Sequence, residues 1–206
     1  MTERPILFSG PMVRAILEGR KTQTRRVVKP QPVDWSPIGA EMVPRRFLGP
    51  ATFLASCPFG RPGDRLWVRE TFMHSPATYV YEASTSTPAV PAETVYRANH
   101  QGDSAGAGWS ASIHMPRWAS RLTLDVKAVR VERLQDINED DAKAEGVEAY
   151  ASIGPDQRVP GPGFNRALLR DQPHRLPFAD LWRSINGEDA WEQNPWVWVV
   201  EFEVLK

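Results

Sequence analysis

A short stretch near the N-terminus concentrates side chains that could do chemistry. Five of the ten residues from Arg20 to Lys29 are basic, no acid interrupts them, and two threonine hydroxyls lie among them. These residues are Arg20, Lys21, Arg25, Arg26 and Lys29, with Thr22 and Thr24. Such a run can contact nucleic-acid phosphates, or it can be a solvated edge strand whose charges protect against aggregation. Both interpretations stay open at this level.

A second candidate group lies in residues 109–122, which read WSASIHMPRWASRL. His114 is a switchable proton donor, Arg117 binds phosphates or carbonyls, and Trp118 offers a flat stacking surface. Together they suit the recognition of one unstacked base. The alternative is a loop that anchors the following strand, with Met115 and Trp118 buried.

The overall composition limits the partners that these groups could serve. The chain has 206 residues, which is enough for one domain with a sizeable core. It has 25 basic and 25 acidic residues, so its formal net charge is zero. Proteins that hold long duplexes usually carry a basic excess, so we expect any nucleic-acid contact to be local.

The sequence contains no pattern typical of a metal site, a cofactor site or a membrane-spanning segment. Cys57 is the only cysteine, which excludes a disulfide within the chain, and we expect a buried structural thiol there. The four histidines, His74, His100, His114 and His174, lack metal-ligand spacing, and no glycine-rich phosphate loop is present. The N-terminus lacks the apolar stretch of a signal peptide, and no apolar run reaches membrane-spanning length. We therefore expect a cytoplasmic protein without a metal or cofactor.

Hydrophobic patterning predicts several strands and three short helices. We expect strands over residues 4–10, 22–28, 63–72, 78–83, 94–98, 121–134 and 195–205, the last one largely buried. We expect helices over residues 11–20, 137–147 and 177–187. Residues 30–62, 99–111 and 150–176 read as loops because they are rich in Pro, Gly and small polar residues.

Single residues refine this pattern of elements. Asn138 is expected to cap its helix, and Gly146 and Gly187 are expected to end theirs. The expected buried helix faces comprise Met12, Val13, Ile16 and Leu17, and then Phe178, Leu181, Trp182 and Ile185. The expected large core fillers are Trp67, Trp196 and Trp198. Arg69 and Glu70 form either a surface ion pair or part of a pocket rim.

In this order, the features resemble the ASCH domains, relatives of the PUA-like RNA-binding barrels. The shared motif is G-x-K-x-x-T-x-R, here GRKTQTRR at residues 19–26. A Gly63-Asp64 turn enters a strand, residues 122–147 match the long strand with its acidic helix, and residues 198–205 match the last strand. Residues at about 30–62, 73–115 and 149–176 are unmatched, as in longer members often carried by phages and prophages.

The resemblance implies a fold and a set of site residues. The implied fold is a single α+β domain over residues 1–206, built on a PUA-like β-barrel of about five or six strands with the three insertions. Some small ASCH proteins are amidohydrolases that remove the acyl group from N4-acetylcytidine. Their functional residues fall by position on Lys21, Thr24 and Glu145 of this chain, and Arg26 occupies the position of the motif's arginine.

The residue types suit this reaction. Amide hydrolysis needs a nucleophile, a proton acceptor and a donor for the leaving amine. Thr24 becomes a nucleophile if Lys21 takes its proton, which requires burial or nearby cations to lower the pKa of Lys21. Glu145 could then hold the leaving amine. On a regular strand Lys21 and Thr24 point to opposite faces, so the chain must turn between them.

We therefore expect a protein that recognises a nucleobase or nucleoside, free or in RNA, and hydrolyses an N4-acylated cytidine. The expected substrate-binding residues are Arg20, Arg25, Arg26, Arg69, Glu70, His114, Arg117 and Trp118. Two other functions stay open, a non-catalytic RNA- or DNA-binding module and a ribonuclease, which is an activity also found in the ASCH group. For Glu145 the alternative is an exposed helix acid without a catalytic role.

Overall fold

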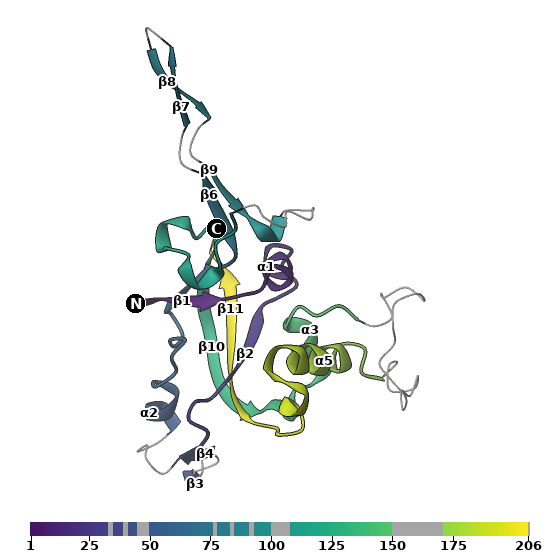
Figure 1. Ribbon diagram of the computed structural model, residues 1–206. Coiled ribbons are helices and arrows are strands. Elements are labelled where there is room, and N and C mark those ends of the chain that lie inside the picture. The colour runs from purple at the N-terminus through teal and green to yellow at the C-terminus, as the bar shows by residue number, and fades with distance from the viewer. Residues whose placement is uncertain are drawn as a thin grey trace.

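The protein is a mixed α+β structure organised around one five-stranded sheet (Figure 1). The computed structural model describes residues 1–32, 35–38, 41–44, 50–75, 78–82, 85–90, 93–99, 108–149 and 171–205. The strands of the sheet, in spatial order, are β1 (Glu3–Leu7), β5 (Arg65–Arg69), β10 (Thr123–Arg133), β11 (Trp196–Val204) and β2 (Gln23–Val27). The β1–β5 pair is parallel, and the other three pairs are antiparallel.

The sheet is open, so the expectation of a closed small barrel is wrong for the described strands. The edge strands β1 and β2 do not pair with each other. The chain runs from β1 through helix α1 (Gly10–Leu17) into β2, and side chains rather than a backbone ladder join the two edges. Arg26 Nη2 on β2 donates a hydrogen bond of 2.6 Å to the Leu7 carbonyl on β1.

The last strand, β11, is buried on both faces because it lies between two apolar clusters. Val197 and Val199 pack on one side with Phe178 and Trp182 of helix α5 (Arg175–Asn186). The alternate residues of β11, which are Trp198, Val200 and Phe202, belong to the main core with residues of β1, β5, β10 and α1. This two-sided burial explains the nearly continuous apolar run and confirms that the strand is largely buried.

The helix signals are confirmed in part. Asn138 caps helix α3 (Glu139–Ala144) by accepting a hydrogen bond of 2.8 Å from the Asp141 backbone N–H. Helix α5 ends before Gly187, which has a φ of 108°. Two residues expected on buried faces are instead exposed, Leu17 at 47% and Ile185 at 64%, because each lies in the last turn of its helix, where packing against the sheet ends.

Residues 30–62 contain more regular structure than the expected loop. Strands β3 (Trp35–Ile38) and β4 (Glu41–Pro44) form an antiparallel pair, and helix α2 (Pro50–Leu54) follows. Phe53 of α2 is buried, with its ring centroid 5.0 Å from that of Trp198. The Pro and Gly content of this stretch predicts a loop, and the packing of Phe53 depends on Trp198, which is distant in sequence.

Two further strand pairs form an arm that projects from the sheet (Figure 1). Strand β6 (Phe72–Ser75) pairs with β9 (Glu93–Tyr96), and β7 (Thr78–Glu82) pairs with β8 (Thr85–Val90). The expected strands at residues 78–83 and 94–98 therefore lie in this arm. Of the loops expected at 99–111 and 150–176, residues 100–107 and 150–170 lie outside the described residues.

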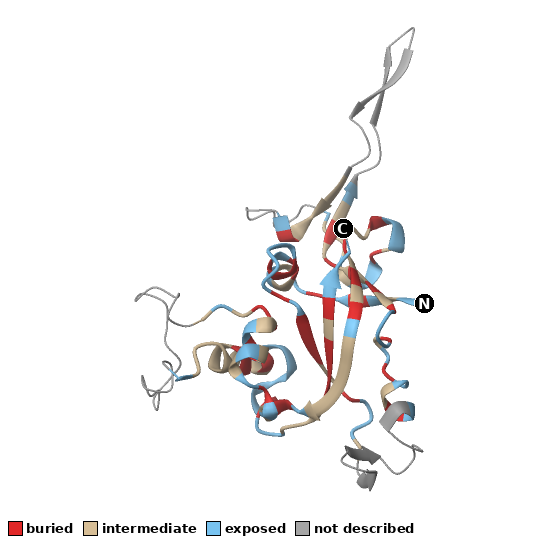
Figure 2. Ribbon diagram, turned by 180° about the vertical axis from the view of Figure 1, so that it is seen from behind, coloured by how far each residue is buried: buried red, intermediate tan, exposed pale blue. Residues whose placement is uncertain are grey.

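Short 3₁₀ helices complete the described elements, and burial concentrates on the sheet. The 3₁₀ helices are η1 (Arg97–Asn99), η2 (Ser112–His114), η3 (Arg117–Ala119), η4 (Leu134–Asp136) and η6 (Glu188–Ala190). Figure 2 shows buried residues gathered on the central strands and on the helix faces that meet them. Among the described helices, none has the length and apolar content needed to cross a membrane.

Candidate functional site

A cavity of about 240 Å³ opens where β1, α1, β2 and α5 meet. Its polar lining comes from Ser9, Lys21, Thr24, Arg25, Arg26, Glu145 and Asn186. Its apolar lining comes from Leu7, Phe8, Met12, Val27, Phe178, Leu181, Trp182 and Ile185. The cavity therefore combines charged groups with an apolar and aromatic wall, which is the usual composition of a small-molecule site.

Lys21 and Glu145 form a buried ion pair in this cavity. Lys21 Nζ lies 2.8 Å from Glu145 Oε2 and also donates a hydrogen bond of 2.8 Å to the Glu145 carbonyl oxygen. The two side chains are only 2% and 5% exposed. Glu145 is therefore not the exposed helix acid that the alternative interpretation required.

Backbone contacts hold Lys21 against the end of α3. Residues 21 and 145 form an isolated antiparallel bridge, and the Lys21 N–H donates to the Ala15 carbonyl of α1. Gly146, with a φ of 81°, permits this approach, since an added Cβ would lie 2.7 Å from Lys21 Cβ and 2.9 Å from Ala15 Cβ. Gly146 thus ends the acidic helix and also makes room for the lysine.

The environment of Lys21 lowers the pKa of its ammonium group. Burial lowers the pKa of Lys21 below its ordinary value of 10.5, the carboxylate of Glu145 opposes this, and the charges of Arg26 and Arg25 add to the lowering. Burial disfavours an ammonium because the charged form loses its hydration. Lys21 therefore meets, in direction, the pKa condition for a base.

Thr24 and Arg26 lie on the same face of β2 and share the cavity with Lys21. They align with Val200 and Trp198 of β11, which point into the main core. Lys21 Nζ and the Arg26 guanidinium lie 5.6 Å and 5.2 Å from the centre of the Phe8 ring. Because Lys21 pairs with the end of α3 before β2 begins, the chain changes direction between Lys21 and Thr24, and both line one cavity.

Within the described part of the chain, two groups in the cavity have no strong partner of their own. The Thr24 side chain makes no hydrogen bond there, and the residue is 4% exposed. Arg26 forms no ion pair with a described acid, and its one hydrogen bond goes to the Leu7 carbonyl. Burial lowers the pKa of Arg26, and the charge of Glu145 opposes this. A hydroxyl and a cation are therefore free to meet a ligand.

Arg25, the neighbour of Arg26, also lines the cavity, but both of its Nη groups are held by acids. Its guanidinium is fully buried and contacts Glu132, Asp141 at 3.1 Å and Glu145 at 3.2 Å. Arg130 extends this network, since it lies 3.1 Å from Glu132 and 2.9 Å from Asp141. Arg25 thus orients the Glu145 carboxylate from behind, and the basic run is not a solvated edge strand.

The other predicted binding residues lie outside the cavity. Arg20 pairs with Glu18 and donates a hydrogen bond of 2.9 Å to the Gly146 carbonyl. Glu70 is 1% exposed and forms a two-point ion pair with Arg121, at 2.9 Å and 3.0 Å. Glu70 therefore belongs to a buried ion pair with Arg121. It forms neither a surface ion pair nor part of the rim of this cavity.

Arg69, His114, Arg117 and Trp118 lie together on another part of the molecule. Arg69 donates a hydrogen bond of 3.0 Å to the Ser112 carbonyl, and Arg117 pairs with Glu3 at 2.8 Å. Trp118 is 65% exposed, so the interpretation that buried it is wrong, although Met115 is buried as that interpretation expected. Trp198 is buried in the core, whereas Trp67 and Trp196 are only partly buried.

Several cavity residues did not emerge from the sequence. For Phe8 the sequence predicts only a strand, and for Trp182, Ile185 and Asn186 it predicts only an amphipathic helix. The pattern that could indicate this cavity is a cation and a hydroxyl close to aromatic residues. The aromatic residues are distant in sequence, so the pattern becomes visible only in the fold. The three acids that hold Arg25 come from β10 (Glu132), from α3 (Asp141) and from the residue after α3 (Glu145), and the sequence does not predict this grouping.

The described part of the chain contains neither a metal-binding group nor a thiol in a setting that favours reactivity. No group of three or more His, Cys, Asp or Glu side chains suited to a metal ion is present among the described residues. Burial raises the pKa of Cys57 to about 11, which disfavours a reactive thiolate. Comparisons with protein-family models, curated proteins and solved structures found no match to this chain.

Proposed function

We propose that the protein is an ASCH-type amidohydrolase that cleaves the acyl amide of an N4-acylated cytosine in the cavity of Lys21, Thr24 and Glu145. One observation carries this proposal. The free hydroxyl of Thr24 lines the same cavity as a buried lysine whose pKa is lowered. These are the two components that an activated hydroxyl nucleophile needs.

The proposed reaction runs in two halves. Neutral Lys21 takes the Thr24 hydroxyl proton while Oγ1 attacks the acyl carbonyl, and the guanidinium of Arg26 stabilises the negative oxygen that forms. The C–N bond then breaks, the N4 amine leaves with the proton from Lys21, and the acyl group remains as an ester on Thr24. Water hydrolyses this ester, which releases the carboxylic acid and restores the hydroxyl. Glu145 holds Lys21 in place throughout and accepts a hydrogen bond from the leaving amine.

The size and lining of the cavity support a single base or nucleoside as the substrate. Its volume of about 240 Å³ is slightly below the range of about 300–1,000 Å³ that is usual for drug-sized ligands. Phe8, Phe178 and Trp182 provide aromatic contacts for a planar ring. A zero net charge also fits a small neutral ligand better than a long polyanion.

The proposed family rests on the motif at residues 19–26 and on the order of elements. The motif lysine and threonine lie before and in β2, and the matched glutamate immediately follows α3. A PUA-like arrangement is part of the proposal, with the open five-stranded sheet corresponding to its barrel strands and Arg26 bridging the β1 and β2 edges.

A non-catalytic binding module is the second candidate, and one contact favours it. Lys21 Nζ uses two of its donors within the protein, on the carboxylate and the carbonyl of Glu145. A protonated lysine held in this way is a structural cross-link between β2 and α3. In that case the cavity binds a base without cleaving it, and Thr24→Ala leaves binding intact.

The test is the conversion of N4-acetylcytidine to cytidine, followed by chromatography with purified wild-type protein and with Lys21→Ala. We expect wild-type turnover and a loss of about 10²–10⁴-fold in Lys21→Ala, which is the usual contribution of a positioned base. Thr22→Ala is the matched control, because Thr22 belongs to the same motif but is exposed and outside the cavity. It is expected to turn over at nearly the wild-type rate.

Two outcomes would contradict the proposal. Absence of turnover by wild-type protein at high enzyme concentration removes this substrate, and tight binding of cytidine under the same conditions then favours the binding module. Cleavage of RNA that depends on Lys21, without release of acetate from N4-acetylcytidine, would assign the cavity to a ribonuclease instead.

A further inference from the structure

Trp118 is an unusually exposed tryptophan. Its exposed fraction is 65%, and the nearby Ile113 is 57% exposed. Leaving a large aromatic side chain in water forgoes the free energy that its burial would contribute, and exposed apolar groups of this kind mark interaction sites. Trp118 therefore has a surface available to a partner.

The backbone around Trp118 is firmly anchored, so the indole is presented in a fixed position. The neighbouring Met115 and Ala119 are each 2% exposed and pack beneath the segment. Ser120 Oγ donates a hydrogen bond of 2.7 Å to the Val68 carbonyl of β5. An exposed side chain on a well-packed support loses little conformational freedom when it binds.

His74, at the base of the arm, contacts Trp118 without stacking on it. The ring centroids are 4.9 Å apart and the ring planes meet at 74°. A T-shaped contact of this kind occupies at most one face of the indole. With 65% of the residue exposed, most of the Trp118 side chain stays accessible to a planar ligand.

Arg117, which precedes Trp118 in the chain, shares a second tryptophan, Trp67 on the outward side of β5, with Arg69. The guanidinium groups of Arg69 and Arg117 lie 5.5 Å and 5.9 Å from the centre of the Trp67 ring. Arg117 also forms a two-point pair with Glu3, with both distances 2.8 Å, yet its side chain is 45% exposed. With Arg65 on the same outward side of the strand, the three arginines outnumber Glu3 and Asp125, and Asp125, opposite Arg65, already pairs with Lys127.

We infer that Trp118, His74, Trp67, Arg69 and Arg117 form a stacking surface for single-stranded nucleic acid. One base stacks on the exposed indole of Trp118, and the adjoining phosphates pair with Arg69 and Arg117. The excess of positive charge around the aromatic rings favours this partner over an apolar peptide or a second copy of the chain. Base stacking also explains an exposed aromatic face, since every base offers a flat surface.

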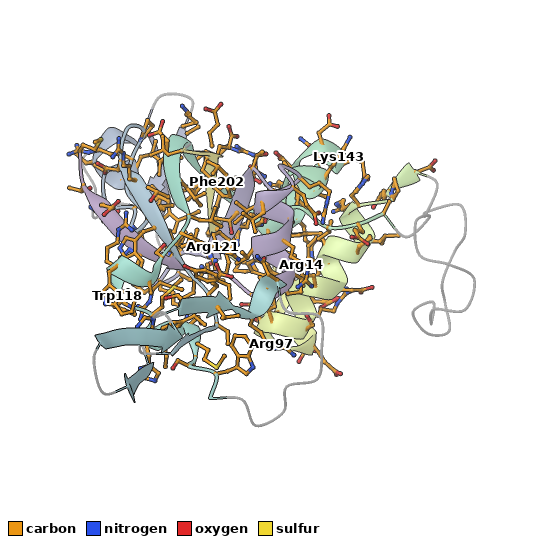
Figure 3. The ribbon with its side chains drawn as sticks, turned by 90° about the horizontal axis from the view of Figure 1, so that it is seen from above. Arg14, Arg97, Trp118, Arg121, Lys143 and Phe202 are labelled. Carbon is orange, nitrogen blue, oxygen red and sulfur yellow. The ribbon has the colours of Figure 1, made fainter. Side chains whose placement is uncertain are left out.

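The stacking surface is separate from the cavity. Helix α5, which forms one wall of the cavity, lies on the opposite side of the view from Trp118 in Figure 3. None of the five residues of the stacking surface lines the cavity. Binding at this surface therefore does not depend on the proposed hydrolysis, and either can fail without the other.

The test is fluorescence anisotropy with a fluorescein-labelled single-stranded oligouridine at low salt. Trp118→Ala is expected to raise the Kd about 5- to 150-fold, the range that corresponds to the loss of one stacked base. Trp118→Phe is expected to retain most of the affinity. Leu17→Ala is the matched control, since Leu17 is a large apolar side chain that is 47% exposed elsewhere. It is expected to bind like wild type.

Charge and turnover measurements complete the test. Arg117→Gln is expected to reduce the slope of log K against log salt by about 0.7, the value for one phosphate contact on a single strand. Trp118→Ala is expected to convert free N4-acetylcytidine at the wild-type rate. The inference is overturned if wild-type protein does not bind the oligonucleotide, or if Trp118→Ala binds it equally well. It is also overturned if sedimentation shows a wild-type dimer that Trp118→Ala dissociates, because the surface then serves self-association.

Discussion

Arg25 and Arg26 are adjacent in sequence but have opposite surroundings on the two faces of β2. Arg25 is fully buried and contacts Glu132, Asp141 and Glu145. Arg26 lines the same cavity as Arg25, but within the described part of the chain it pairs with no acid. The same side chain therefore has a structural role on one face and is available to a ligand on the other.

The difference shows that the acids within reach decide what a buried cation does. A guanidinium whose Nη groups are held by carboxylates is fixed in place, and removing it leaves several acids uncompensated. A guanidinium that faces a cavity without a counter-ion lowers the free energy of any negative charge that develops there. The contrast between the two arginines gives measurable predictions for each.

The largest expected loss of stability follows from Arg25→Met. The change removes the cation shared by three acids, and we expect the free energy of unfolding to fall by about 3–5 kcal/mol, as for one partner of a buried ion pair. Urea denaturation of both proteins measures this. A loss below about 1 kcal/mol would contradict the role of Arg25 as a structural cation.

Arg26→Met is expected to change activity rather than stability. Losing one group that stabilises the developing oxyanion lowers kcat by about 10²–10³-fold. The free energy of unfolding is expected to change by less than about 1 kcal/mol, because no described acid loses its partner. Turnover of N4-acetylcytidine and urea denaturation on the same samples test both parts. Equal turnover by wild type and Arg26→Met would remove Arg26 from the mechanism.

Gly146→Ala tests whether the close approach of Lys21 to α3 matters. Gly146 and Gly19 both have left-handed backbones, with φ of 81° and 73°, but only the Cβ at 146 would meet Lys21. Left-handed strain costs about 1–2 kcal/mol at either position, and crowding adds about 1–3 kcal/mol at position 146. We expect Gly146→Ala to be the less stable variant and to lose turnover. Comparable stability and turnover in Gly19→Ala and Gly146→Ala would exclude this packing role.

The pH dependence of turnover tests the protonation state of Lys21. Burial lowers its pKa from 10.5, and only the neutral amine accepts the Thr24 proton. The kcat/KM value is therefore expected to rise by up to about tenfold per pH unit below the folded pKa and to level off above it. Lys21→Arg stays charged, so it is expected to lose the activity and to show no rise of kcat/KM with pH. A kcat/KM value that falls with rising pH over the same interval would indicate that Lys21 acts in its charged form.

The smallest expected effect is that of Arg69→Gln on turnover. Arg69 is basic and was expected to bind substrate, but its guanidinium donates to the Ser112 carbonyl and packs on Trp67 away from the cavity. We expect kcat/KM for the free nucleoside to change by less than about twofold. A tenfold loss would mean that the substrate extends beyond the cavity to β5.

The strand face on which each motif residue lies can be predicted from the sequence. Alternation along residues 22–28 separates Thr24 and Arg26 from Arg25, and the gap before β2 allows Lys21 to reach the same cavity. The capping residue Asn138 and the terminating Gly146 could also be predicted, because caps depend on local hydrogen bonds and backbone angles.

The pairing of distant charges could not be predicted in the same way. Glu132, Asp141 and Glu145 lie more than a hundred residues from Arg25, and only the fold brings them together. The aromatic wall of the cavity likewise combines Phe8 with residues of α5. The strand order, which places β1 and β2 at the two edges of the sheet, also depends on pairings between distant segments that hydrophobic periodicity does not predict.

The most direct test of the central claim is a single-turnover comparison of wild type with Thr24→Ala, with enzyme in excess over N4-acetylcytidine. Our account predicts complete conversion to cytidine by wild type and a rate at least about 1,000-fold lower in Thr24→Ala, as expected when a nucleophile is removed. Circular dichroism is expected to show the same fold for both proteins. Conversion by Thr24→Ala at the wild-type rate would contradict the account, because a hydroxyl at position 24 would then take no part in breaking the amide.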